Sequence, residues 1–155
     1  MWASGVGGGG GGSAGFDSKL RATLSGDQTI ADDTWTLVDL DETDYDGLSE
    51  LDAANSRIVL ADDGWYAFNY SIALEDLGGG AEGYCHVFVN GTIVAGGTQV
   101  LGNLSVVDFR VNGSFDIQLS AGDLVTFKVF HTQGADRTLY HTQSGGTIVC
   151  MKRFA

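Results

Sequence analysis

Hydrophobic and polar residues alternate along most of the chain after residue 15, which is the pattern of β-strands with one buried face. The clearest segment is 65–74, in which every second residue is aromatic or aliphatic. These residues are Tyr66, Phe68, Tyr70, Ile72 and Leu74. We therefore predict that this segment forms a strand at the centre of the hydrophobic core.

Two short turns join alternating segments. Asn90-Gly91 stands between Val-Phe-Val and Thr-Ile-Val, and this dipeptide favours a two-residue hairpin turn with both residues at positive φ. The segment 113–130 holds two alternating runs joined by Gly122-Asp123, with Phe115 and Phe127 on their apolar faces. This pattern predicts a second β-hairpin.

The same reasoning along the whole chain predicts an all-β sandwich of about ten strands, because short alternating runs are separated by Gly, Asn and Asp and no amphipathic helix is evident. The predicted strands are Lys19–Leu24, Thr34–Leu40, Ser56–Leu60, Trp65–Leu74, Tyr84–Val89, Thr92–Ala95, Leu104–Val111, Ser114–Leu119, Leu124–His131, Arg137–Thr142 and Thr147–Lys152.

The first fifteen residues have a different composition. They contain six consecutive glycines, which cannot bury a core and which favour a flexible arm. We expect residues 1–15 to be a glycine-rich attachment arm and residues 16–155 to be a single head domain. The arm residues predicted to contact a neighbouring protein are Met1, Trp2, Val6, Gly7 and Gly12, with Trp2 as the aromatic anchor.

Charge and hydropathy exclude two classes of partner. Twenty acidic and eight basic residues give a net charge of −12, which repels nucleic-acid phosphates, so we expect no nucleic-acid binding. No apolar run approaches the roughly 20 residues of a membrane-spanning helix, so we expect no membrane association.

Several motifs occur in the order found in one known family. Gly64-Trp65-Tyr66-Ala67-Phe68 is similar to that family's Gly-x-Tyr-x-Phe element, and Val87–Gly91 to its middle hairpin. Leu119–Val125 matches its Leu-x-x-Gly-Asp-x-Val pattern. On these residues, 16–155 resembles the jelly-roll domain of tumour necrosis factors and complement globular heads. The resemblance implies a jelly-roll β-sandwich that assembles as a homotrimer.

Jelly-rolls with a glycine-rich leader resemble the decoration, fibre and spike proteins of bacterial and archaeal viruses. This implies a non-enzymatic virion protein that is assembled in the host cytoplasm and projects from a capsid or tail. Its expected partners are other copies of itself and, through the arm, the major capsid or tail protein. The alternative is a receptor- or carbohydrate-binding head, for which the candidate aromatics are Trp35, Tyr45, Trp65 and Tyr140.

Catalytic, cofactor and metal chemistry have little support in the sequence. His86, His131 and His141 are scattered and stand beside no recognisable nucleophile motif, so we predict no catalytic residue, cofactor or metal ligand. The acidic run 39–47 does not fit an EF-hand, because Ala53 falls where a bidentate Glu is required. We predict that this run is a solvated acidic loop.

Four asparagines and two cysteines complete the candidates. Asn69, Asn90, Asn103 and Asn112 begin Asn-x-Ser/Thr sequences, and we expect no glycan at any of them, with Asn69 in a strand the least accessible. Cys85 and Cys150 are either two buried thiols, which we favour, or a pair bridging two strands.

Overall fold

The computed structural model describes residues 18–100, 109–142 and 146–154, and for residues 97–100 it describes the backbone only. Their thirteen strands are β1 (Lys19–Thr23), β2 (Gln28–Ile30), β3 (Thr36–Leu37), β4 (Glu42–Asp46), β5 (Leu51–Asp52), β6 (Arg57–Val59), β7 (Gly64–Leu74), β8 (Glu82–Val89), β9 (Thr92–Val100), β10 (Phe109–Leu119), β11 (Leu124–His131), β12 (Arg137–Leu139) and β13 (Ile148–Arg153). One 3-10 turn, Ala53–Asn55, separates β5 from β6. The predicted all-β sandwich is confirmed.

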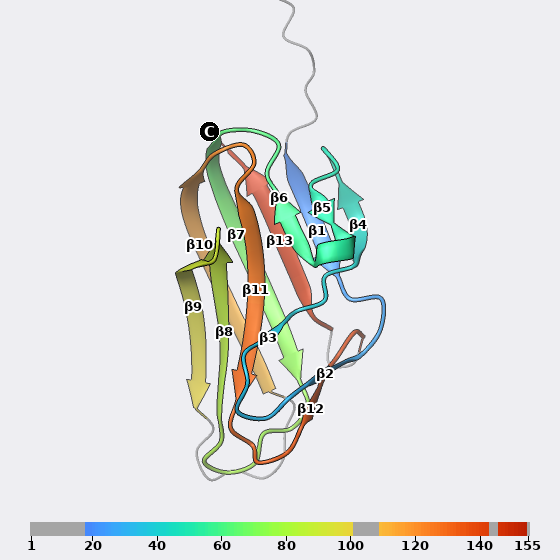
Figure 1. The fold of residues 1–155 in the computed structure, drawn as a ribbon, viewed down its shortest axis with the longest axis vertical. Helices are drawn as coiled ribbons and strands as arrows, with labels where there is room; N and C mark the ends of the chain where they lie inside the picture. Colours follow the sequence, from blue (N-terminus) through green and yellow to red (C-terminus); the bar gives the residue numbers. More distant parts are fainter. Residues whose placement is uncertain (1–17, 101–108, 143–145, 155) are drawn as a thin grey trace, which may run out of the picture.

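The strands form two antiparallel sheets packed face to face, as Figure 1 shows. The seven-stranded sheet runs β2-β12-β7-β13-β1-β4, with β10 also paired to β7. The six-stranded sheet runs β5-β6-β11-β8-β9, with β3 also paired to β11. In the view of Figure 1 the six-stranded sheet lies in front, so its outer face points toward the reader.

The core lies between the sheets and is built on β7, as the alternation predicts. Tyr66, Phe68, Ile72 and Leu74 have no exposed surface and Tyr70 is 5% exposed. The opposite sheet contributes Val87 from β8 and three residues of β11. These three are Val125, Phe127 and Val129. Burying such side chains supplies most of the free energy that stabilises a sandwich of this size.

The predicted hairpin at 113–130 is wrong. β10 pairs with β7 in one sheet, whereas β11 pairs with β8, β6 and β3 in the other, so the turn at Gly122 crosses from sheet to sheet. Alternation shows that one face of each strand is buried, but it does not identify the neighbour. The break predicted between residues 111 and 114 is also absent, because β10 is continuous over Phe109–Leu119.

The acidic run at 39–47 is not a solvated loop. Its centre forms β4, which pairs with β1 through a register shift between Arg21 and Ala22. The carboxylates have defined partners: Asp44 forms an ion pair with Arg21, and Asp46 accepts hydrogen bonds from the amides of Glu50 and Leu51 at 2.8 Å each. Pairing with β1 overrides the low strand propensity of Asp.

Other local predictions have mixed outcomes. The Asn90-Gly91 turn is confirmed, with φ of 50° and 81°, and it joins β8 directly to β9. Asn69, on β7, is exposed, as are Asn90 and Asn112, so the strand does not bury the Asn69 side chain, and Asn103 lies outside the described residues. Asn112 lies inside β10.

The two cysteines are free thiols on different sheets, so the bridging alternative is wrong. Cys85 points inward from β8 and is fully buried. Cys150 is only partly buried on β13, where its backbone neighbours are Arg21 and Asn69. The favoured prediction of two buried thiols therefore holds for Cys85 and only in part for Cys150.

Candidate binding surface on the six-stranded sheet

The outer face of the six-stranded sheet carries an unusual number of aromatic side chains. Because side chains alternate along a strand, β8 buries Cys85 and Val87 and turns Tyr84, His86 and Phe88 outward. On β11 the partly buried outward residues are Thr126, Lys128 and Phe130. Lys128 stands directly opposite His86, and Phe130 opposite Tyr84. The two central strands therefore present four rings on one face, with Thr126 and Lys128 beside them.

Trp35 packs onto this surface from the loop before β3 and forms an aromatic cluster with Tyr84, His86 and Phe130. Its ring centroid lies 4.5 Å from that of His86, 5.3 Å from Phe130 and 6.3 Å from Tyr84. Trp35 is still 40% exposed. The cluster therefore offers an indole face to solvent that is supported from below by other rings.

Gly96 of β9 gives the His86 ring its space. The two residues face each other in register, and a Cβ at position 96 would lie 2.5 Å from Cδ2 of His86. No described group bonds to the buried Nδ1 of His86. The Tyr84 hydroxyl donates to the Glu82 carboxylate, and this hydrogen bond raises the pKa of Tyr84.

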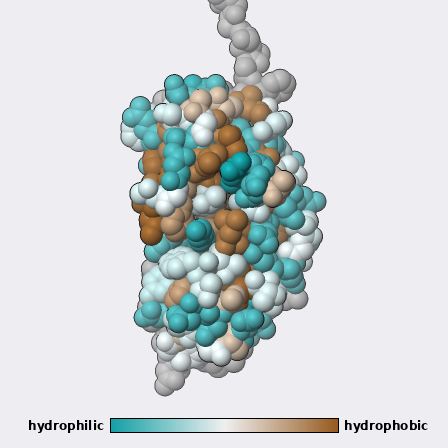
Figure 2. Space-filling view, viewed as in Figure 1, coloured by the Kyte–Doolittle hydropathy of each residue, from teal (hydrophilic) through white to brown (hydrophobic). Residues whose placement is uncertain are grey.

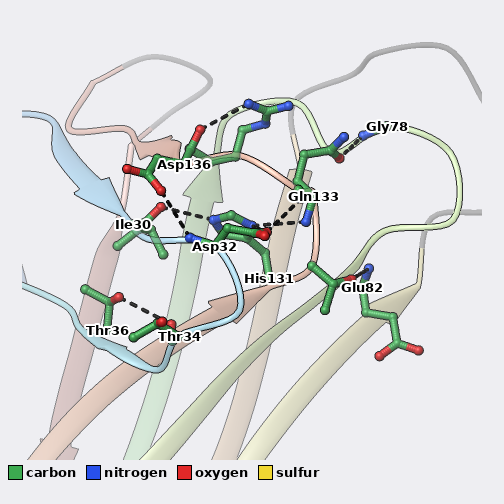
Figure 3. A network of polar contacts seen from close by, with 12 residues as sticks. Ile30, Asp32, Thr34, Thr36, Gly78, Glu82, His131, Gln133 and Asp136 are labelled. Carbon is green, nitrogen blue, oxygen red and sulfur yellow. Dashed lines mark hydrogen bonds and ion pairs between the residues drawn. The ribbon is translucent and has the colours of Figure 1, made fainter.

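A polar network at the end of β11 fixes the loop that carries Trp35 (Figure 3). His131 is fully buried, with Nε2 3.1 Å from the carbonyl oxygen of Ile30. The amide of Asp33 donates to the His131 carbonyl at 2.9 Å. Asp32 accepts from the amide of Gly134 at 2.8 Å, and its own amide donates to Asp136 at 3.3 Å.

This network ties the β2–β3 loop to the β11–β12 loop. Gln133 extends the same network to Gly78, since its side-chain oxygen accepts the Gly78 amide hydrogen bond (Figure 3). The polar atoms of His131 are used in holding loops together, so the residue positions Trp35 rather than facing a ligand.

Next to the aromatic cluster lies a hollow of about 450 Å³ between β3, β6, β11 and the β8–β9 turn. Two basic side chains line it. Arg57 donates from Nε to Asp52 at 2.8 Å, and Nζ of Lys128 lies 4.9 Å from the centre of the Phe88 ring. Hydrogen bonds from Asn55, with a further contribution from Arg57, lower the pKa of Asp52. Figure 2 shows hydrophilic and hydrophobic residues side by side on the middle of this face.

The four candidate aromatics do not form one site. Tyr45 lies on β4 at the edge of the seven-stranded sheet, and Trp65 is the second residue of β7. Tyr140 follows β12 and is partly buried, with its amide bonded to the Ala73 carbonyl. Only Trp35 joins an aromatic cluster with the outer residues of β8 and β11. The arm candidates Met1, Trp2, Val6, Gly7 and Gly12 lie outside the described residues.

Sequence reasoning missed the partners of Trp35. The outward ring residues of β8 and β11 were visible in the alternation, but nothing in the sequence showed that these strands are neighbours. His141 lies in a bend far along the chain from His86, and the three histidines sit at separate places in the fold. Within residues 18–100, 109–142 and 146–154, no three His, Cys, Asp or Glu side chains are grouped to hold a metal ion. In those same ranges, no helix is long and apolar enough to cross a membrane.

Comparison with known proteins identifies the fold. No family model and no curated protein sequence matches the chain. Among solved structures, it is similar to the Eiger TNF of S. frugiperda, with a TM-score of 0.64 and 14% identity over 90% of this chain and 93% of that one. Murine APRIL has a TM-score of 0.64 and 13% identity over 89% and 99% of the two chains.

The globular domain of zebrafish complement 1qA gives a similar result, with a TM-score of 0.64 and 13% identity over 89% of this chain and 98% of that one. The architecture is therefore the jelly-roll shared by the tumour necrosis factor and complement C1q structures. At this identity the likeness concerns the fold, so function has to be argued from the chain's own surfaces.

Proposed function

We propose that this chain is a non-enzymatic structural protein that works as a homotrimer of jelly-roll heads. The observation that carries the proposal is an incompletely covered part of the core at the edge formed by β9 and β10. These two strands belong to different sheets and pack beside each other where the sandwich is open. We call this region the β9–β10 edge.

Apolar side chains that contact the core remain partly exposed at this edge. They are Val89, Ala95, Phe115 and Ile117. Phe115 stacks on the buried ring of Phe68 with centroids 5.1 Å apart. Close by on β9, Ile93 is 54% and Val94 is 39% exposed. In Figure 2 hydrophobic residues gather on the left of the upper half of the view, near β10 and the start of β9.

Covering this edge with another copy would remove apolar surface from water and would shield two strand edges from unspecific pairing. When an edge of one copy packs on a different surface of the next, repeated contacts form a ring if the rotation between copies closes and an open filament if it does not. The similarity to tumour necrosis factor and complement jelly-rolls supports a ring of three copies.

We further propose that the trimer decorates or projects from a virus capsid or tail, with residues 1–15 as the attachment arm. The glycine-rich composition of the arm supports docking between neighbouring subunits, because glycine allows close backbone approach. The net charge of −12 would keep the projecting heads soluble and apart. The test of this setting is to look for the chain in purified particles, with and without residues 1–13.

The oligomeric state is tested by light scattering during size-exclusion chromatography of the full chain and of a chain that starts at Ala14. We expect each to have three times the mass of its own single chain, which is 16.3 kDa for the full chain, since the proposed contacts belong to the head. A monomer at all concentrations tested would refute the trimer, and a trimer only in the full chain would move the contacts to the arm.

A receptor- or carbohydrate-binding head is the second candidate function. The aromatic cluster of Trp35, Tyr84, His86 and Phe130 favours it, because a supported and exposed indole is a common element of binding sites. This role is compatible with a trimer, since the cluster lies on the face of the six-stranded sheet and not on the β9–β10 edge.

A further inference from the structure

The hollow beside the aromatic cluster has a charge that differs from the rest of the molecule. The chain has eight basic residues, and two of them, Arg57 and Lys128, line this one hollow. Among the described residues, no carboxylate side chain lines it. By contrast, the hollow beside β2 is lined by Asp27, Asp39 and Asp41. Asp52, which is paired with Arg57, offsets one of the two charges, so the local excess of positive charge comes from Lys128. In a chain of net charge −12, this excess favours an anionic ligand.

Both cations can still bind such a ligand. Lys128 has no carboxylate within ion-pair distance among the described residues, and it rests above the Phe88 ring. Arg57 uses Nε for Asp52, and its terminal nitrogens have no partner in the described part of the chain. Guanidinium and ammonium groups form their strongest hydrogen bonds with carboxylates and phosphates.

The remaining walls fit a sugar ring better than a phosphate group. Leu37 and Leu124 provide apolar surface, while Thr126 provides a hydroxyl and Asn55 a carboxamide oxygen. The Asn55 nitrogen already donates to Asp52 at 2.9 and 3.0 Å. A pyranose ring has apolar CH faces and a rim of hydroxyl groups, so it can use both kinds of wall. The volume of about 450 Å³ lies within the roughly 300–1,000 Å³ of small-molecule sites.

The aromatic cluster adjoins the hollow. Lys128 stands between its register partners Leu37 on β3 and His86 on β8, and His86 packs under the exposed ring of Trp35. A chain of sugars that leaves the hollow in this direction reaches an indole on which a second ring can stack.

We propose that this hollow binds a hexuronate, a sugar ring that carries a carboxylate. The carboxylate lies between Lys128 and Arg57, and the hydroxyl groups face Thr126 and Asn55. Further residues of an acidic oligosaccharide extend over Trp35. The inference goes beyond the structural role proposed above and names a ligand class for the second candidate function. It concerns single heads, so the oligomeric state and the binding experiment can fail independently.

The test is to titrate the full chain separately with D-glucuronate, D-glucose and acetate. Binding is monitored by the amide chemical shifts in NMR spectra. We expect glucuronate to shift the amides of Asn55, Thr126 and Lys128, and we expect glucose and acetate to bind at least about tenfold more weakly because each lacks one half of the recognised chemistry. Equal shifts with acetate would show a bare carboxylate site and would overturn the sugar assignment.

Two matched variants locate the site. Lys128→Gln should weaken glucuronate binding about tenfold, whereas Lys152→Gln, which removes an exposed lysine from β13 on the other sheet, should leave it unchanged. Thermal unfolding of each variant checks the fold. Unchanged binding in a folded Lys128→Gln protein, or the same loss in both variants, would overturn the proposal. Thr126→Val is a second test, because it removes the hydroxyl group proposed to face the sugar and leaves every charge in place. It should also weaken glucuronate binding.

Discussion

Cys85 lies on the inner face of one sheet and Cys150 on the outer face of the other, and this difference in position makes the two thiols differ in reactivity. Cys85 points from β8 into the core, and burial raises the pKa of its thiol to about 12. Cys150 points away from the core of its sheet. Burial also raises the pKa of Cys150, but the charge of Arg21 acts in the opposite direction. The thiolate is the reactive form, so a raised pKa and a closed environment both slow reaction.

We predict that a soluble disulfide reagent at pH 8 labels Cys150 of the native protein much faster than Cys85. At this pH only about one Cys85 thiol in ten thousand is ionised when the pKa is about 12. The measurement is the labelling rate followed by mass spectrometry, with a Cys150→Ser protein as the control. That variant should remain unlabelled until denaturant is added. Equal rates for the two thiols would contradict the burial of Cys85.

The residues around Trp35 show which parts of a site a sequence can predict. Trp35 itself could be selected, because an aromatic residue beside a turn is a common binding element. Its partners could not, since Tyr84, His86 and Phe130 lie about 50 to 95 positions away and meet Trp35 only when β8 and β11 become neighbours. The hollow lined by Arg57 and Lys128 could not be predicted either, because its walls come from strands whose pairing the sequence does not show.

At the scale of strands, β10 and β7 show how a glycine adapts one strand to another. The two pair over eleven residues, and Gly113 stands opposite Tyr70. A Cβ at position 113 would lie 2.2 Å from Cζ of the Tyr70 ring. That ring is 5% exposed and packs edge-on against Phe127, so it cannot move aside without disturbing the core. The glycine that suggested a strand break is instead a packing position.

Gly113→Ala should therefore lower the free energy of unfolding by about 1–3 kcal/mol, because the added methyl group overpacks the core. Chemical denaturation monitored by tryptophan fluorescence measures this change. Gly26→Ala is the matched control, since no described atom beyond Gly26 and its two chain neighbours lies within 4 Å of the position that its Cβ would occupy. If the two substitutions had the same effect, the close approach of Tyr70 would not be the cause.

Strand positions were predictable where one face is buried, and pairing was not. The alternation located β7, β8 and β11 to within two residues at each end. It missed β4, where the polar sequence Glu-Thr-Asp-Tyr-Asp pairs with β1 at the edge of its sheet and has little apolar pattern. It also joined β10 and β11 as a hairpin, because a short turn between alternating strands has the same sequence whether it stays in one sheet or crosses to the next.

At the scale of the whole molecule, assembly depends on what covers the β9–β10 edge. Phe115 and Ile117 complete the core from inside, but one side of each remains in contact with water. On the far edge of the seven-stranded sheet, β4 exposes a mixture of carboxylates and Tyr45. Burying a mainly apolar edge is more favourable than burying a charged one, because the charged groups would lose their hydration. We therefore expect copies to contact one another through the apolar β9–β10 edge, and we expect the charged β4 edge to stay in water.

We predict that Ile93→Asp converts the proposed trimer to monomers while the head stays folded. Ile93 is 54% exposed in the single chain, so an Asp there costs little in the monomer, whereas it would place a charge inside the proposed interface. Light scattering should show the mass fall from three chains to one, and circular dichroism should show an unchanged strand signal. Tyr45→Ser is the control on the β4 edge, where Tyr45 is 47% exposed, and it should leave the mass of three chains intact. A trimer that survives Ile93→Asp, or one that Tyr45→Ser dissociates, would place the contact between copies on another surface.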